Sequence, residues 1–437
     1  YQKMAYYRGV ENYNDLRFDN AETFFDKSLK YPNSKSLEAL CYYWKADMAH
    51  QKSDYEKSKT LINKFLSMAS AVSAEHSDKV NAGTANYLQG YNYYKKKDYA
   101  NADAYFLKAV TTLKNDQNIT NKQNIYPDAM IRLADCYFMQ KQYKSSAQYY
   151  DEVIKSNALG ADYALYQKAI IDGLGGNYND KIAGMKTLVT RFPSSGFADD
   201  AIMQIGNTYM AQDKDELAIE AFKSLFAKNP KSDQVPDAYL KLGLIYFNRD
   251  SYDESLSWYQ KVVQYYPSTP ASNEAMLAIK EIYIAKGDPA GYITYANKYP
   301  GSKVTVSEQD SLVYLSAEKQ FFNGDMDKAL QGFTSYLTQF PKGYFALQAN
   351  FYRAECLFTK QDFPNALKGY EYVISQSQNR FTERSTARAA NINYYDLKNY
   401  VRSYELYTKL QTVATLDENK RECLIGLMRT SFYLKKY

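Results

Sequence analysis

The sequence predicts an all-α fold built from repeated pairs of helices. Apolar positions recur three, four or seven residues apart rather than alternately, which is the spacing of helix faces. The 437 residues include only 19 Gly and 11 Pro, so the chain has few of the turn residues that a β-rich fold needs. One pattern also returns along the whole chain, and such a period indicates stacked supersecondary units rather than separate domains.

The repeated pattern starts at a small residue, which we call the anchor. Aromatic or apolar residues follow three, nine and sixteen positions later, and a second small residue follows at twelve. Gly90, Tyr93, Tyr99, Ala102 and Phe106 show this pattern in full. The last seven steps between anchors are all 37 residues long. The predicted anchors are Gly9, Ala46, Gly90, Ala134, Ala169, Gly206, Gly243, Lys280, Ala317, Ala354, Asn391 and Met428.

Each repeat is predicted to hold two helices. Helix A carries the anchor and helix B the small residue twelve positions later, so the two backbones can approach closely where the helices cross. A polar turn joins them, and we interpret the lysine run of one such turn, at 95–97, as solvated. Helix B ends at a proline, which cannot continue a helix, and a following serine can cap the next helix A. The predicted endings lie at Pro32, Pro193, Pro230, Pro267 and Pro300.

Some stretches depart from the regular pattern. The steps that lead to Gly90 and Ala134 are each 44 residues long, and the polar insertions at 67–78 and 114–124 are predicted to be loops. At Lys280 the anchor is not small, and the helix B that follows is predicted to be short.

The predicted organisation is one continuous array. Residues 1–160 form irregular repeats of 37–44 residues, and residues 161–437 form repeats with a 37-residue period. The anchors give about eleven helix pairs plus one terminal helix A. Because that helix has no helix B after it, we expect the array to continue beyond Tyr437.

The small, aromatic, alanine and proline positions at these spacings resemble the tetratricopeptide repeat (TPR) family. The resemblance covers essentially the whole chain and implies a right-handed α-solenoid, a superhelix of stacked antiparallel helix pairs. Aromatic-Pro-x-Ser endings, as at 31–34 and 192–195, resemble the TPR subgroup of the bacterial cell envelope, which includes the outer-membrane assembly lipoprotein and Tol-Pal-associated proteins. This implies a periplasmic or outer-membrane-associated location, with the cytoplasm as the alternative.

Composition and motifs argue against several functions. The chain has 54 Lys plus Arg against 49 Asp plus Glu, a net charge of +5, which is too small an excess for a nucleic-acid binder. No zinc spacing, nucleophile elbow or phosphate loop occurs, so we expect no metal, no cofactor and no enzymatic activity. No apolar run reaches the roughly 18–20 residues of a membrane span. The cysteines, which we expect to be reduced, are Cys41, Cys136, Cys356 and Cys423.

Candidate binding residues lie on helix A. The TPR resemblance implies that positions three before, one after and four after the anchor line a concave groove. Three glutamates recur one position after the anchor at 37-residue spacing, beside aromatic residues, and this combination suits a basic or amphipathic peptide. The alternative is that the aromatic residues are core and the glutamates are solvated. The predicted site residues are Glu281, Glu318, Glu355, Tyr314, Phe321, Phe351 and Phe358.

Two other features bear on the ligand. The clamp with which other TPR proteins hold a chaperone C-terminal carboxylate is absent, because Tyr314, Glu318, Tyr352 and Ser385 occupy its positions. A chaperone tail is therefore disfavoured. Three arginines also lie on one helical face, and we interpret them as solvated or internally paired. They are Arg380, Arg384 and Arg388.

We therefore predict a non-enzymatic scaffold that binds a protein or peptide in the groove of a TPR superhelix, within a bacterial envelope-associated assembly. Two alternatives remain open. One is a carbohydrate-binding solenoid, for which only Trp44 and Trp258 are available as tryptophan platforms. The other is a helical-repeat accessory region of a larger enzyme.

Overall fold

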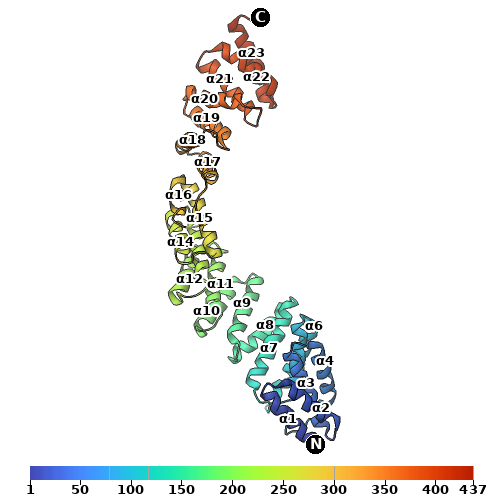
Figure 1. Ribbon diagram of the computed structural model, residues 1–437. Coiled ribbons are helices and arrows are strands. Elements are labelled where there is room, and N and C mark those ends of the chain that lie inside the picture. Colours follow the sequence, from blue (N-terminus) through green and yellow to red (C-terminus); the bar gives the residue numbers. More distant parts are fainter. Residues whose placement is uncertain (78, 117, 300, 437) are drawn as a thin grey trace. The chain divides into compact units, whose positions relative to one another are not determined.

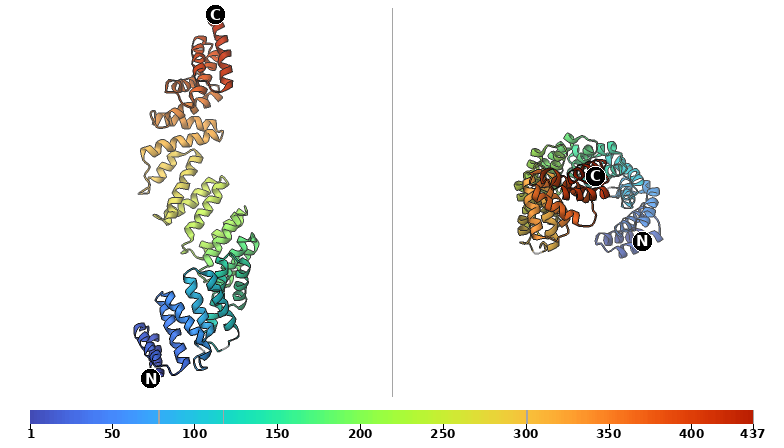
Figure 2. Two further views of the ribbon diagram at one scale, coloured as in Figure 1. Left: turned by 90° about the vertical axis from the view of Figure 1, so that its right-hand side faces the viewer. Right: turned by 90° about the horizontal axis from the view of Figure 1, so that it is seen from above.

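The computed structural model describes residues 1–77, 79–116, 118–299 and 301–436. These residues form helices and connections, with no strand among them. The chain divides into two compact units, Tyr1–Val235 (unit 1) and Pro236–Tyr437 (unit 2). Within each unit, successive helices run back and forth beside one another (Figure 1, Figure 2). Odd-numbered helices are A helices and even-numbered helices are B helices.

Unit 1 contains six A–B pairs. They are α1 (Gln2–Asn14), α2 (Phe18–Lys30), α3 (Lys35–Gln51), α4 (Tyr55–Met68), α5 (Ala82–Lys95), α6 (Tyr99–Asn115), α7 (Lys122–Met139), α8 (Tyr143–Ser156), α9 (Ala161–Leu174), α10 (Tyr178–Arg191), α11 (Ala198–Met210) and α12 (Asp215–Lys228). A 3₁₀ turn, η1 (Ala69–Ala71), follows α4. The two predicted insertions fall at the α4–α5 and α6–α7 connections, and two of their residues, Asp78 and Gln117, lie outside the described residues.

Unit 2 contains five pairs and a terminal helix, and its first helix begins at the unit boundary. The helices are α13 (Val235–Asn248), α14 (Tyr252–Tyr265), α15 (Pro270–Lys286), α16 (Pro289–Ala296), α17 (Val306–Phe322), α18 (Met326–Gln339), α19 (Ala346–Thr359), α20 (Phe363–Ser375), α21 (Thr382–Asn391), α22 (Tyr400–Val413) and α23 (Asp417–Leu434). A π-helical turn, η2 (Ile392–Asp396), extends α21. The described residues thus confirm the prediction of eleven pairs and one terminal helix.

The anchors lie where helix A crosses helix B. A Cβ atom on Gly90 would lie 2.7 Å from the ring of Phe106, sixteen residues later, and one on Gly243 would lie 2.7 Å from the ring of Tyr259. The hydroxyl of Ser255, twelve residues after Gly243, donates a hydrogen bond of 2.7 Å to the Gly243 carbonyl. The predicted close approach of the two backbones is therefore confirmed.

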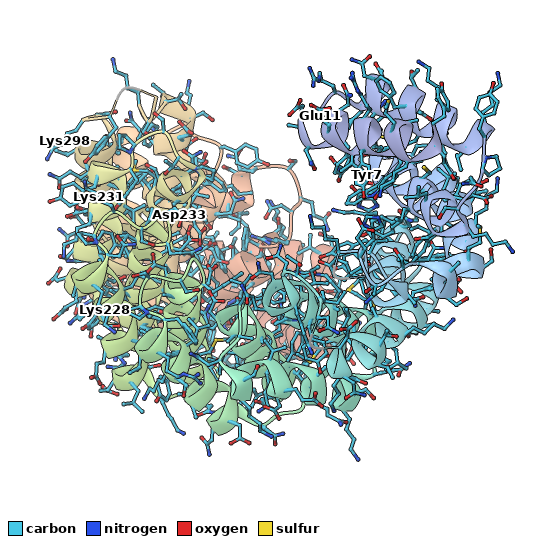
Figure 3. The ribbon with its side chains drawn as sticks, turned by 90° about the horizontal axis from the view of Figure 1, so that it is seen from below. Tyr7, Glu11, Lys228, Lys231, Asp233 and Lys298 are labelled. Atoms are coloured by element: carbon cyan, nitrogen blue, oxygen red, sulfur yellow. The ribbon has the colours of Figure 1, made fainter. Side chains whose placement is uncertain are left out.

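Prolines follow the B helices as predicted. Helices α2, α10, α12 and α14 each end two residues before a proline. Beside one of these prolines, the exposed side chains of Lys228 and Lys231 project from the ribbon (Figure 3). The four prolines are Pro32, Pro193, Pro230 and Pro267. The fifth predicted ending, Pro300, lies outside the described residues.

The predicted serine caps are correct for α3 and wrong for α11, α15 and α17, the last of which has Thr305 rather than Ser302 as its cap. Ser34 precedes α3 and its hydroxyl accepts a hydrogen bond from a backbone N–H of the first turn. The N-cap of α11 is Phe197, and the Ser195 hydroxyl accepts the Phe197 backbone N–H, ahead of the helix, while it donates to Asp162 of the preceding repeat. Ser268 has a positive φ of 63°, which leaves Thr269 as the cap of α15.

Every A–B turn uses the same backbone conformation. In each turn the residue seven positions after the anchor has a positive φ, although only three of these eleven residues are glycine. This left-handed conformation costs little for glycine and more for other residues. The residues are Leu16, Ser53, Lys97, Lys141, Gly176, Asp213, Asp250, Gly287, Gly324, Gln361 and Lys398.

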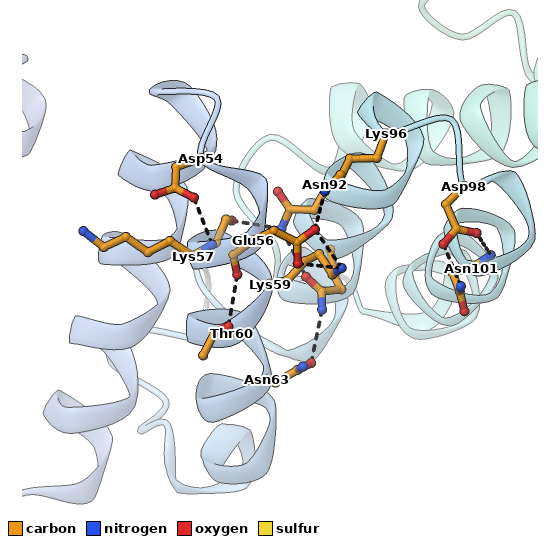
Figure 4. Close-up of polar contacts among 12 residues, drawn as sticks. Asp54, Glu56, Lys57, Lys59, Thr60, Asn63, Asn92, Lys96, Asp98 and Asn101 are labelled. Carbon is orange, nitrogen blue, oxygen red and sulfur yellow. Dashed lines mark hydrogen bonds and ion pairs between the residues drawn. The ribbon is translucent and has the colours of Figure 1, made fainter.

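Among the described residues, polar side chains then cap six of the eleven B helices, including α4 and α6. The Asp54 carboxylate accepts the Lys57 backbone N–H at 3.1 Å, and Asp98 accepts that of Asn101 at 3.3 Å (Figure 4). Lys96, in the middle of the predicted lysine run, forms an ion pair of 2.5 Å with Glu56 on α4, and both side chains are largely exposed. The run is thus a solvated turn with one surface ion pair.

The predicted irregularity after Lys280 is confirmed. Helix α16 has eight residues, whereas its neighbours α14 and α18 have fourteen. Lys280 is half-buried rather than buried. The shortened helix leaves a hollow of about 420 Å³ beside it, which side chains of α17 and α18 also line.

Met428 is wrongly predicted as the anchor of the terminal helix. Its side chain is 67% exposed. In α23 the close approach is made instead by Gly426, where a Cβ atom would collide with the ring of Tyr407 on α22. The physical reason is that α23 makes its close approach to the B helix before it, α22, so the contact falls at Gly426 and not two residues later.

Candidate interaction surface

The predicted site residues fall on three A helices of unit 2. Glu281 is an exposed residue of α15, and no hydrogen bond or ion pair of the described residues joins it to the others. The remaining six lie on α17 and α19. Helix α21 lies next in the array and contributes Arg384 and Arg388, and Arg380 lies in the connection just before it.

Two of the predicted aromatic residues are interior side chains. Tyr314 is 2% exposed, and its ring stacks on that of Phe345 with centroids 4.3 Å apart. Phe351 is 5% exposed and stacks on Phe381 at 4.4 Å. Both therefore hold neighbouring repeats together, and neither presents a free ring face to a ligand.

Glu355 is also an interior residue. Its side chain is 8% exposed and accepts a hydrogen bond of 2.7 Å from the Tyr370 hydroxyl. Arg384 of the next pair forms an ion pair with it, and Arg388 lies 3.9 Å away. Burial and the adjacent carboxylate raise the pKa of Tyr370. The Glu355 charge is thus neutralised from within the chain.

Glu318 has a different environment. It is half-buried and accepts a hydrogen bond of 2.5 Å from the Tyr314 hydroxyl. No ion pair of the described residues involves Glu318. The three glutamates therefore differ in burial and in their partners. Burial, followed by the bond to Glu318, raises the pKa of Tyr314.

The three arginines each lie over an aromatic ring. The guanidinium carbon is 4.5 Å from the Phe381 ring centroid for Arg380, 5.9 Å from that of Phe351 for Arg384 and 4.1 Å from that of Phe358 for Arg388. Such cation–π contacts hold a guanidinium plane in place. The arginines are therefore positioned side chains rather than freely rotating surface charges.

Aromatic side chains border the arginines. The rings of Phe321 and Tyr352 are 4.9 Å apart, and those of Phe322 and Tyr352 are 5.9 Å apart. Phe322 is 67% exposed and Tyr352 is half-buried. We use the name arginine–aromatic face for the surface made by Phe321, Phe322, Tyr352, Arg380, Arg384 and Arg388.

Unit 1 contains a related buried carboxylate. Asp135 follows its anchor by one position, as Glu355 does, and accepts hydrogen bonds from Tyr150 at 2.5 Å and Tyr163 at 3.0 Å. Arg132 forms an ion pair with it. Burial raises the pKa of Asp135, and Arg132 opposes that shift. In both units, therefore, a buried acid one position after the anchor accepts a hydrogen bond from a tyrosine fifteen residues later.

That spacing is the signal that sequence reasoning missed. Tyr150 and Tyr370 occupy the repeat position that carries phenylalanine after four other anchors. A hydroxyl added to a buried ring needs a hydrogen-bond partner. The acid one position after the anchor supplies it, and this explains why Glu355 is buried.

The two tryptophans are engaged within the chain. Trp44 donates a hydrogen bond of 3.2 Å to the Tyr6 hydroxyl and packs against Tyr13. Lys261 lies 3.7 Å above the ring of Trp258.

The described residues contain no group of His, Cys, Asp or Glu side chains arranged to hold a metal ion. No helix of the described residues combines the length and the apolar character that a membrane crossing requires.

Comparison with known protein families identifies the repeats. Tetratricopeptide repeat models match residues 83–112, 128–158 and 203–272. These three stretches are tetratricopeptide repeats. The three matches cover the pairs α5–α6, α7–α8, α11–α12 and α13–α14.

The comparison with curated proteins found no match. Among solved structures, several TPR-type chains are similar to this chain. The apo form of RapI has a TM-score of 0.45 at 11% identity, and the match covers 78% of this chain and 86% of that one. A tetratricopeptide repeat protein from Parabacteroides merdae ATCC 43184 has a TM-score of 0.38 at 15% identity, covering 63% and 99%. PilW, a type IV pilus biogenesis factor, has a TM-score of 0.37 at 17% identity, covering 54% and 97%.

Proposed function

We propose that this TPR protein is a non-enzymatic scaffold that binds a protein or peptide partner on the A helices of unit 2. The observation that carries the proposal is the arginine–aromatic face. Arginine and large aromatic residues supply most of the binding energy in many protein interfaces. Here they lie together on one face, partly exposed and held by packing.

The face suits binding because its side chains are already ordered. Stacked rings beneath the arginines fix their positions, so little side-chain entropy remains to be lost when a partner binds. The same face offers guanidinium N–H groups for hydrogen bonds and the exposed Phe322 ring for apolar contact. A protein-binding role uses all of these groups.

We further propose that the scaffold works in an assembly of the bacterial cell envelope. The aromatic-Pro-x-Ser endings of the B helices support this location. Fractionation of the cells that produce the full-length protein tests it directly. Recovery with the envelope fraction is expected, and recovery in the cytoplasmic fraction alone would overturn this part of the proposal.

Site-specific photo-crosslinking in the producing cells tests the binding role. A photoreactive phenylalanine at Phe322 is expected to give a discrete cross-linked product of one identifiable protein. The same group at Tyr265, an equally exposed aromatic on the B helix α14, serves as the matched control. Absence of any product at position 322, or the same products at both positions, would contradict a partner site on this face.

A further inference from the structure

We propose that the partner contacts the arginine–aromatic face through an acidic, extended segment whose carboxylate side chains pair with Arg380, Arg384 and Arg388. This inference deepens the proposed binding function and rests on it. It differs from the sequence expectation of a basic partner, because the structure changes the charge that this face presents.

The charge argument starts from the buried carboxylate. Glu355 is 8% exposed and already bonded to Tyr370, so it offers nothing to a ligand. Glu318 is the other carboxylate beside the face and is bonded to Tyr314. The face thus carries three arginines beside two carboxylates that are already bonded within the chain. The net charge that it presents to solvent is therefore positive.

Donor groups remain open on the arginines. A guanidinium carries five N–H donors. The Arg384 side chain is 59% exposed, although one of its nitrogens is bonded to Glu355. Arg380 lies over the Phe381 ring and makes no ion pair with any described residue. Both side chains can thus donate to an incoming carboxylate in the bidentate geometry that arginine favours.

The spacing of the arginines indicates the form of the ligand. Arg384 and Arg388 are four residues apart on α21, which is about 6 Å along a helix axis. Alternate residues of an extended chain point to the same side and are about 6.6 Å apart. An extended segment with acidic residues at alternate positions therefore matches Arg384 and Arg388, and an apolar residue at one end could contact Phe322.

Fluorescence anisotropy with the full chain tests the inference. The probe is a labelled, amidated peptide with glutamate at alternate positions, serine between them and phenylalanine at one end. We expect saturable binding that weakens as salt rises, because exposed charge pairs are screened. A peptide with lysine in place of each glutamate is expected not to bind.

Arg380→Gln is the most informative variant, because this arginine has no internal ion pair whose loss could disturb the fold. It is expected to weaken glutamate-peptide binding about tenfold, the loss of one charge-assisted contact. Arg384→Gln should weaken it further, with circular dichroism as the check on folding. Arg402→Gln serves as the control, since Arg402 lies on the B helix α22 and pairs with Glu371 and Glu405.

Three outcomes would overturn the inference. They are no binding of the glutamate peptide, equal binding of the lysine peptide, and an unchanged affinity in Arg380→Gln. A peptide that binds only with a free C-terminal carboxylate would also overturn it, because the ligand group would then be a chain end. If the peptide fails but cross-linking at Phe322 succeeds, the partner chemistry is wrong and the scaffold function stands.

Discussion

The Glu355 carboxylate lies in the interior of unit 2, where groups from two neighbouring helices surround it. Tyr370 donates from the B helix of its own pair, and Arg384 and Arg388 approach from the next A helix. A buried carboxylate is tolerated only when its hydrogen bonds and charge are met in this way. The stability of the contact between α19 and α21 therefore depends on a few polar atoms.

Removal of one hydroxyl tests this dependence. Tyr370→Phe should lower the free energy of unfolding by about 1.5–3 kcal/mol, the range for hydrogen bonds to charged groups. Tyr372→Phe is the matched control on the same helix, because the Tyr372 hydroxyl makes no hydrogen bond with a described residue. Urea unfolding measures both variants. Equal effects would mean that the Glu355 contact contributes no stability.

Glu383 provides a prediction about pH. Burial alone would raise the pKa of this carboxyl, but hydrogen bonds from Thr415, Asn419 and the Leu416 backbone lower it from its ordinary 4.5 to about 2. A pKa that is lower in the folded state contributes stability above pH 4.5, and this is lost as the pH falls towards 2.

The variant Glu383→Gln should therefore be less stable than the native chain at pH 7, and the difference should shrink between pH 4.5 and 2. Urea unfolding at a series of pH values measures it. Glu254→Gln, at an exposed position on α14, should show no such trend. A difference that stays constant down to pH 2 would contradict the lowered pKa.

At the level of the helix pair, the A–B crossing determines which residues can stand at the anchor. Gly243→Leu would drive a side chain into the Tyr259 ring, which already lies 2.7 Å from where a Cβ atom would be. Overpacking of this kind costs about 1–3 kcal/mol or more. Lys96→Leu, in an exposed A–B turn, should cost less than about 1 kcal/mol, since it removes only a surface ion pair. Thermal and urea unfolding compare the two, and equal losses would mean that the anchors are misassigned.

The helix pairs could be predicted from the sequence because the same small and aromatic residues recur at the same spacing in successive repeats. Gly90 and Gly243 recur with a ring sixteen residues later, so the crossing is visible without coordinates. Met428 could not be placed in this way, because the rule assumes a following B helix. Whether a residue at this position is buried depends on which helix packs beside it, and the sequence of its own helix does not determine that.

The candidate site was less predictable for a related reason. The pairing of Glu355 with Arg384 joins two repeats and depends on side-chain directions, which the period does not encode. The aromatic rows also look alike in sequence whether they are covered or exposed. Phe351 is buried and Phe322 is exposed, and only the packing of the next A helix separates them.

At the scale of the whole molecule, the reactivity of the four cysteines tests the packing of the repeats. All four are buried and free, and burial raises the pKa of both Cys41 and Cys356 to about 12. A buried thiol with a raised pKa reacts slowly, because the thiolate is the nucleophile. Thiol titration at pH 8 should find little reaction in the folded chain and four groups after denaturation. Fewer than four groups in denaturant without reductant would reveal a disulfide and contradict the assigned packing.

Amide hydrogen exchange measured by mass spectrometry, on the full chain with and without the alternating glutamate peptide, tests the binding face most directly. The predicted result is slower exchange at 346–359 and 376–391, which carry Tyr352 and the three arginines of the arginine–aromatic face, with no change at 363–375 on the B helix α20. The protection should be lost in Arg380→Gln. Protection confined to B helices, or protection that Arg380→Gln leaves unchanged, would contradict a partner site on the A helices of unit 2.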